Sequence, residues 1–87
     1  MEEKAKKEYI YNLVIMQNHN LLDVMAFHKR KDAQTYMAIA GFYAQQQREK
    51  KGITDCELLI PSNNNIIIQW NGKVDTLTFD VVRSVLK

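Results

Sequence analysis

One stretch of the chain, residues 32–51, fits a single secondary structure with little competition. Asp32 can serve as a helix N-cap because its carboxylate can accept hydrogen bonds from the first turn, and Gly52 stands where a left-handed residue commonly ends a helix. At about 100° per residue, the apolar residues of this helix fall within roughly 160° of arc. They are Ala33, Tyr36, Met37, Ile39, Ala40, Tyr43 and Ala44. A face this wide predicts a long helix that lies on a β-sheet.

The length and composition are those of one ordinary globular domain. A chain of 87 residues can bury one core of modest size, and 46% hydrophobic and 25% charged residues argue against disorder. We expect residues 1–8 to be a charged, mobile leader and residues 9–87 to form the single domain. The net charge of +2 neither requires nor excludes a nucleic-acid partner.

The single cysteine, Cys56, cannot form an internal disulfide, and the first residues are charged where a secretory signal would be apolar. No apolar run approaches the roughly 20 residues that a membrane-spanning helix needs. The sequence therefore predicts a cytoplasmic protein without a membrane span. Heavy use of Lys, Asn and Ile, whose codons are rich in A and T, indicates an A/T-rich genome such as those of many bacteria and phages.

The first part of the chain predicts a β-hairpin. Residues 9–17 are rich in β-branched and aromatic side chains and read as a strand, and residues 18–20 read as a turn. Residues 21–28 fit two structures, a second strand or a helix capped by Asn20. We favour the strand, because the polar residues 28–32 would interrupt the apolar face of a continuous helix.

The second part of the chain predicts three more strands. Residues 55–60 form a short strand that ends at Pro61. Residues 66–70 and 73–77 flank Asn71-Gly72, a dipeptide that readily adopts a type I′ turn, so they should form a two-residue hairpin.

The register of this last hairpin follows from its turn. Trp70 should lie opposite Lys73 and Ile68 opposite Asp75, which would lay the lysine stem over the indole ring. After the hairpin, Thr78 or Asp80 can cap a short C-terminal helix. The residues that would share one side of that helix are Val81, Val82, Val85 and Leu86.

The predicted element order is β-β-α-β-β-β-α, an α+β fold with the long central helix on one face of a mostly antiparallel sheet. Both faces of the first hairpin are apolar in this arrangement. One face carries Tyr11, Leu13, Ile15, Leu21, Met25 and Phe27, and the other carries Ile10, Val14, Met16, Leu22, Val24 and Ala26. A sheet with one solvated face alternates apolar with polar residues, so we expect the second face to be covered, in part by another chain.

The residues that commonly carry chemistry form no local pattern. His19 and His28 have no neighbouring ligand at a spacing typical of a metal site, and Cys56 has no motif of a nucleophile beside it. The three glycines are scattered, so no phosphate-binding loop is present. We therefore predict no catalytic, cofactor or metal site and expect a protein that is not an enzyme.

The favoured hypothesis is an interaction module that binds another protein chain, either a second copy or a host protein, in the manner of a small regulator or inhibitor. Phe42 lies outside the apolar arc of the helix, on a side that we predict to bind the partner. The predicted partner-binding residues are Thr35, Ala38, Phe42 and Gln46. The alternative is that Phe42 is core, buried beneath the C-terminal helix.

A second hypothesis is a nucleic-acid-binding regulator. Lys29, Arg30 and Lys31 precede the helix N-terminus, where cations oppose the helix dipole unless an anion binds there. A phosphate would suit this loop, with residues 45–47 as auxiliary contacts. A solvated loop is the simpler explanation of the same residues.

Overall fold

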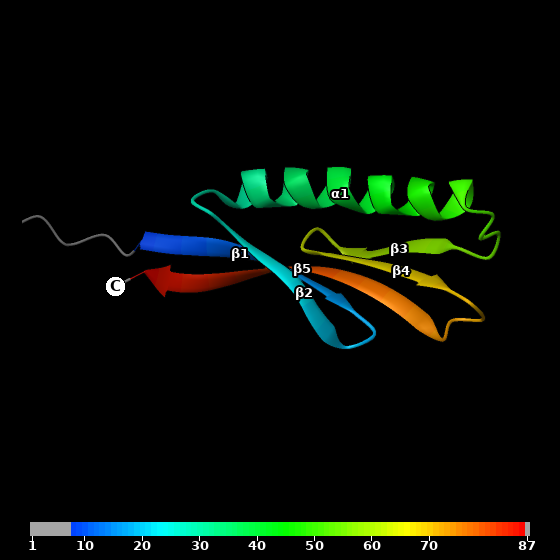
Figure 1. Cartoon of the computed structure of the whole chain (residues 1–87). Coiled ribbons are helices and arrows are strands. Elements are labelled where there is room, and N and C mark those ends of the chain that lie inside the picture. Colours follow the sequence, from blue (N-terminus) through cyan, green and yellow to red (C-terminus); the bar gives the residue numbers. More distant parts are fainter. Residues whose placement is uncertain (1–7, 87) are drawn as a thin grey trace, which may run out of the picture.

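The computed structural model describes residues 8–86, which form a five-stranded antiparallel sheet with one helix along one face (Figure 1). The elements are β1 Glu8–Gln17, β2 Asn20–Phe27, α1 Arg30–Lys50, β3 Glu57–Ser62, β4 Asn65–Trp70 and β5 Asp75–Leu86. The strand order is β2-β1-β5-β4-β3. The predicted α+β class is therefore confirmed. The predicted leader lies outside the described residues except for Glu8, which begins β1.

The predicted C-terminal helix is wrong. The chain from Asp75 onwards continues as one strand of 12 residues, β5, which pairs with β4 on one side and β1 on the other. The β-branched residues Val81, Val82 and Val85 favour a strand. The decisive factor is tertiary, because β5 supplies β1 with a partner along its whole length, from Glu8 opposite Leu86 to Gln17 opposite Leu77.

The core lies between α1 and the sheet. Its buried residues are Leu13, Ala33, Met37, Ile66, Ile68, Leu77 and Phe79. The helix comes close to β4 at Gly41, where an added Cβ would stand 3.2 Å from Ile66 Cδ1. Small residues, Ala33 and Gly41 among them, therefore form much of the helix face that meets the sheet.

The predicted orientation of the helix is wrong by roughly 70° of rotation, counting about 100° per residue. Tyr36, Ile39 and Tyr43 were expected on the sheet and are instead exposed. The buried face is centred on Ala33, Met37 and Gly41. Small side chains let the helix backbone approach the sheet more closely than a face of tyrosines would.

The two ends of α1 differ in how they are capped. Lys29 is the N-cap residue, and its side chain makes no capping hydrogen bond. Asp32, which was predicted to be the N-cap, lies in the first turn instead. At the C-terminus, the N–H of Gly52 donates to the carbonyl of Glu49 at 3.0 Å, and the N–H of Ile53 donates to that of Arg48 at 3.1 Å. This is a Schellman motif, and the φ of +87° at Gly52 confirms the predicted helix end.

The first hairpin confirms the strand prediction for the uncertain segment, which forms β2. Its turn has two residues, Asn18 and His19, both with positive φ, while Asn20 already pairs with Gln17. The register shifts by one residue between the pairs Ile15–Asp23 and Met16–Leu21, which marks a β-bulge in β2.

The last hairpin has a four-residue loop at 71–74, not the predicted two-residue turn. Trp70 lies opposite Asp75 and Ile68 opposite Leu77, so the register differs by two residues from the prediction. An even shift leaves each residue on the same face of the sheet. Asp55 holds the loop, because its Oδ2 accepts a hydrogen bond of 2.8 Å from the N–H of Gly72.

Candidate protein-interaction surface

The side of α1 that points away from the sheet carries exposed apolar side chains. Ile39 is 66%, Phe42 52% and Tyr43 61% exposed. Together with Gln45 and Gln46 they line a shallow depression of about 540 Å³. We call Thr35, Ile39, Phe42, Tyr43 and Gln46 the outer helix face. No described element covers this face, so Phe42 is not a core residue within the single chain.

The structure places the four predicted partner-binding residues on one helix. Thr35, Phe42 and Gln46 are exposed on the outer helix face, and Ala38 beside them is half-buried. Sequence reasoning missed Ile39 and Tyr43, which it assigned to the buried side. The spacing of Thr35, Ile39, Phe42 and Gln46, alternately four and three residues apart, is that of a helix face that meets another helix.

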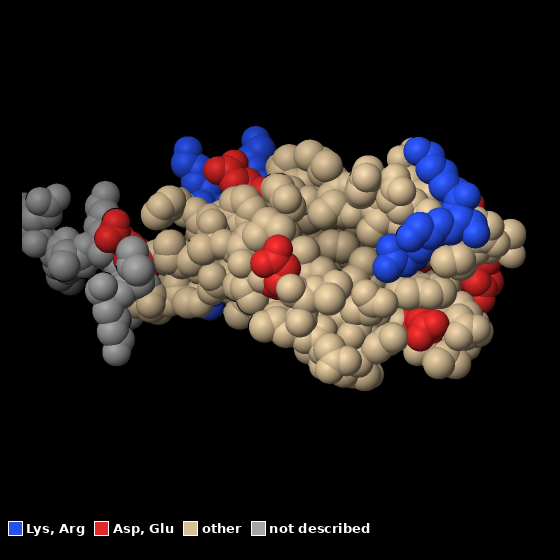
Figure 2. Space-filling view, viewed as in Figure 1, with Lys and Arg blue, Asp and Glu red and all other residues tan. Residues whose placement is uncertain are grey.

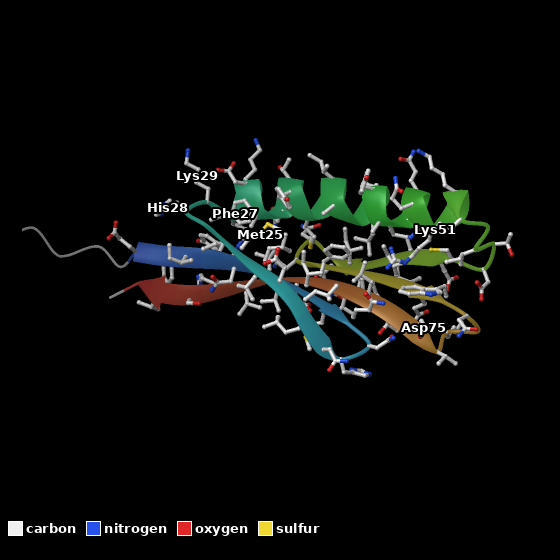
Figure 3. The ribbon with its side chains drawn as sticks, in the orientation of Figure 1. Met25, Phe27, His28, Lys29, Lys51 and Asp75 are labelled. Atoms are coloured by element: carbon white, nitrogen blue, oxygen red, sulfur yellow. The ribbon has the colours of Figure 1, made fainter. Side chains whose placement is uncertain are left out.

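Lysines and arginines mark both ends of this surface. Lys29, Arg30 and Lys31 stand at the N-terminal end of α1, and Lys50 and Lys51 stand at its C-terminal end (Figure 2). Lys29 and Lys51 lie at opposite ends of the helix (Figure 3). The helical rise separates the two groups by about 30 Å. The outer helix face is therefore an apolar centre between two ends with a net positive charge, where Asp32 and Glu49 offset only part of the charge of the cations.

Arg48 belongs to the core side of the helix rather than to this surface. Its guanidinium carbon lies 4.3 Å from the centroid of the Trp70 ring, and its Nη1 donates to the Ala44 carbonyl at 3.1 Å. The predicted contact between Lys73 and Trp70 is therefore wrong, because Arg48 occupies the ring. Burial leaves Arg48 Nε without a hydrogen-bond partner.

The sequence predicted that Lys29, Arg30 and Lys31 precede the helix, but Arg30 and Lys31 lie in the first turn of α1 and only Lys29 precedes it. Two stacked pairs of arginine and tyrosine lie at this end of the helix. Arg30 lies 5.2 Å from the centroid of the Tyr11 ring, and Arg83 lies 4.4 Å from that of Tyr9. Tyr11 and Arg83 are paired residues of β1 and β5, so the two stacks adjoin. Of the predicted anion-binding residues Lys29, Arg30 and Lys31, Arg30 thus lies in a stack that adjoins that of Arg83. Residues 45–47, predicted as auxiliary contacts, lie in the other half of α1 and are not brought close to Lys29, Arg30 and Lys31.

The titratable residues that could carry chemistry are spread over the fold. His19 lies in the β1–β2 turn and His28 follows the far end of β2, about 30 Å away at a strand's rise per residue. Burial raises the pKa of the Cys56 thiol, which disfavours the thiolate that a nucleophile needs. Within residues 8–86, no three His, Cys, Asp or Glu side chains gather as a metal site would require.

The second apolar surface is on the opposite side of the molecule. Met25 and Phe27 of β2 lie beneath the first turns of α1 (Figure 3). The residues that alternate with the core residues point the other way. We call the apolar residues among them the open sheet face, and they are Val14, Met16, Leu21, Val24, Ala26, Ile67 and Val82; polar residues, Asn12, Asn65, Thr78 and Asp80 among them, lie on the same side of the sheet. The prediction that both faces of the first hairpin are apolar is therefore confirmed, apart from the change at the bulge.

Comparisons with protein-family models, with curated proteins and with solved structures found no match to this chain. Within the described residues, no helix is both long and apolar enough to cross a membrane.

Proposed function

We propose that this protein is a small, non-catalytic interaction module of the cytoplasm that binds another protein through the outer helix face. The observation that carries the proposal is the exposure of Ile39, Phe42 and Tyr43 side by side on a helix whose other side is fully used by the core. Exposed aromatic and aliphatic side chains around a depression are the usual anchors of protein interfaces.

The net positive charge at the two ends of α1 supports an acidic partner. A helix with apolar residues in its middle and carboxylates near both ends would match the apolar centre and the two cationic ends. The depression is shallow and comes from a single helix, which suits a protein segment more than a small molecule. We therefore propose an acidic amphipathic helix of a host protein as the partner.

Selection from a library of random helical peptides tests the proposal. Enriched peptides should carry apolar residues three or four positions apart and Asp or Glu toward both ends. Their affinity, measured by fluorescence anisotropy, should fall at least about tenfold for Phe42→Ala, because central aromatic anchors commonly contribute more than 1 kcal/mol. Val74→Ala is the matched control, since Val74 is exposed in the distant β4–β5 loop.

Two results would contradict this proposal. One is enrichment of peptides that show no acidic bias. The other is equal binding of the selected peptides to the unchanged chain and to Phe42→Ala. The double variant Lys50→Glu, Lys51→Glu adds a further test. It should weaken the binding of acidic peptides and leave the binding of neutral peptides unchanged.

Nucleic-acid binding is the second candidate, and the paired Arg–Tyr stacks favour it. Arg30 and Arg83 could contact phosphates while Tyr9 and Tyr11 offer rings on which bases stack. Mobility shifts with single-stranded and duplex DNA and RNA at low salt test this candidate. Binding that weakens with salt and with Arg83→Ala would support it, whereas no binding at low salt would remove it.

A further inference from the structure

The β4–β5 loop carries the only Asn-Gly pair in the chain, Asn71-Gly72. In this pair the backbone nitrogen of the glycine can attack the side-chain amide of the asparagine, because glycine has no side chain to hinder the approach. Both residues are exposed, so water reaches them. The loop therefore holds the sequence most prone to deamidation, the spontaneous loss of the asparagine amide.

The reaction is intramolecular and consumes only water. The Gly72 nitrogen bonds to Cγ of Asn71, the Cγ–Nδ2 bond breaks, and the proton from the Gly72 nitrogen leaves with the amide group as ammonia. The product is a five-membered succinimide ring. Water then opens the ring at one of its two carbonyl carbons. Opening at Cγ gives aspartate, and opening at the backbone carbonyl gives isoaspartate, whose main chain runs through the side-chain carbons.

The folded loop restrains both reacting groups. The N–H of Gly72, whose nitrogen is the nucleophile, donates to Asp55 Oδ2 at 2.8 Å. Nδ2 of Asn71, the leaving group, donates to Asp75 Oδ2 at 3.1 Å. The nucleophile gains negative charge as it loses its proton, and a carboxylate at hydrogen-bond distance disfavours that charge. The fold therefore opposes the attack at the nitrogen and holds the amide that must move to meet it.

The same carboxylates make the products unfavourable in the folded loop. Asp75 Oδ1 also accepts from Asn18 Nδ2 at 3.1 Å, so Asp75 joins this loop to the β1–β2 turn. An aspartate at position 71 has an acceptor where the amide has its donor, and it puts a second negative charge beside Asp75. Isoaspartate adds one atom to the main chain of a loop whose ends, Trp70 and Asp75, are paired. Either product weakens this end of the sheet.

We propose that Asn71 is a site of spontaneous deamidation that the native fold protects through Asp55 and Asp75. A chain that unfolds, or whose loop opens, reacts and refolds to a less stable product. Converted chains then accumulate with the time that the loop spends open. This inference concerns the loop and does not depend on the proposed partner of the helix.

Peptide mapping by mass spectrometry after incubation at neutral pH tests the proposal. The folded chain should convert at position 71 at least about tenfold more slowly than the same chain in urea. Asp55→Ala should speed conversion of the folded chain by about threefold to tenfold, because it removes one hydrogen bond and one charge. Asp32→Ala is the matched control, since this exposed carboxylate lies in the first turn of α1, and should leave the rate unchanged.

A second control separates protection by the loop from general stability. Gly41→Val strains the contact of the helix with the sheet and leaves the loop intact, so it should speed conversion less than Asp55→Ala. Circular dichroism first establishes that each variant is folded, and Asp55→Asn, which removes only the charge and should also speed conversion, replaces Asp55→Ala if the latter is not.

Three results would overturn the proposal. One is conversion in the folded chain that is as fast as in urea. Another is the absence of conversion at position 71 in urea. The third is a folded Asp55 variant that converts no faster than Asp32→Ala or Gly41→Val, since the Asp55 carboxylate would then not protect the amide.

Discussion

Replacing Phe42 with alanine should lower the free energy of unfolding by only about 0.3–1 kcal/mol. The side chain is 52% exposed. Full burial of a phenylalanine contributes about 1.5–3 kcal/mol, so its buried half contributes about 0.8–1.5 kcal/mol. Alanine recovers roughly 0.5 kcal/mol through its higher helix propensity. For a domain of this size the net loss corresponds to a fall of roughly 1–8 °C in the thermal midpoint.

Phe79→Ala is the matched comparison, because Phe79 is 2% exposed in the core. That change should cost about 3–5 kcal/mol, a large part of the total stability of a small domain. Thermal unfolding followed by circular dichroism compares the two variants. The measurements need several protein concentrations, because dissociation of a dimer lowers the apparent midpoint in a concentration-dependent way.

A concentration-independent loss of about 3 kcal/mol or more for Phe42→Ala would refute the reasoning. Phe42 would then contribute as a core residue does, and the outer helix face would lose its central anchor. The expected pattern is the reverse, a small loss of stability together with the loss of peptide binding described above.

Four further substitutions test the last turn, the contact of the helix with the sheet and the acid dependence of stability. Lys73→Gly should stabilise the fold by up to about 1 kcal/mol and Gly72→Val should destabilise it by about 1–2 kcal/mol, because both positions have positive φ; equal midpoints in urea would contradict this. Gly41→Val should cost about 1–3 kcal/mol in thermal unfolding, since even a Cβ stands 3.2 Å from Ile66 Cδ1, and an unchanged midpoint would mean that the helix can move away. Hydrogen bonds from the backbone N–H groups of Gly72 and then Asn71 hold the pKa of Asp55 below its usual range. The native state therefore favours the ionised carboxylate. The contribution of the Asp55 carboxylate to the free energy of unfolding is complete above about pH 4 and is lost as the pH falls through the lowered pKa. Urea unfolding at a series of pH values measures the difference in stability between the unchanged chain and Asp55→Asn. This difference should shrink on acidification, and a difference that is constant with pH would exclude this role of Asp55.

The parts of the fold that local pattern determines were predictable. Gly52 ends the helix as expected because a left-handed residue is a local requirement. The nearly continuous apolar residues of β1 and β2, which do not alternate with polar ones, likewise predicted that both faces of the hairpin are apolar. These features depend on residues close together in the sequence.

The errors arise where distant segments decide the structure. The pairing of β5 with β1 overrides the helical spacing of Val81, Val82 and Val85. The orientation of α1 depends on how closely its backbone can approach Ile66, which the wide apolar arc of the helix does not reveal. The last loop has four residues rather than two, and a side chain 17 residues earlier, Asp55, bonds to its backbone.

For the candidate site, the sequence located Phe42 on the free side of α1 but assigned Ile39 and Tyr43 to the core. The same rotation of the helix explains both errors. The small residues Ala33, Ala40, Gly41 and Ala44 were the available signal, because a face of small residues marks a close approach to the sheet. The stacks of Arg30 and Arg83 on tyrosines required the pairing of β1 with β5 and had no local signal.

The central position of β5 also constrains the order in which the fold can form. β5 is the last strand along the chain, yet it joins the β1–β2 hairpin to the β3–β4 hairpin. Contacts such as Tyr9 with Val85 close nearly the whole chain, and contacts of such long sequence separation slow folding. During synthesis, β1 emerges first and has an unpaired edge until β5 follows. The early hairpin therefore exposes two apolar faces and a free edge in that interval, which makes nascent or incompletely folded chains the species most prone to aggregate.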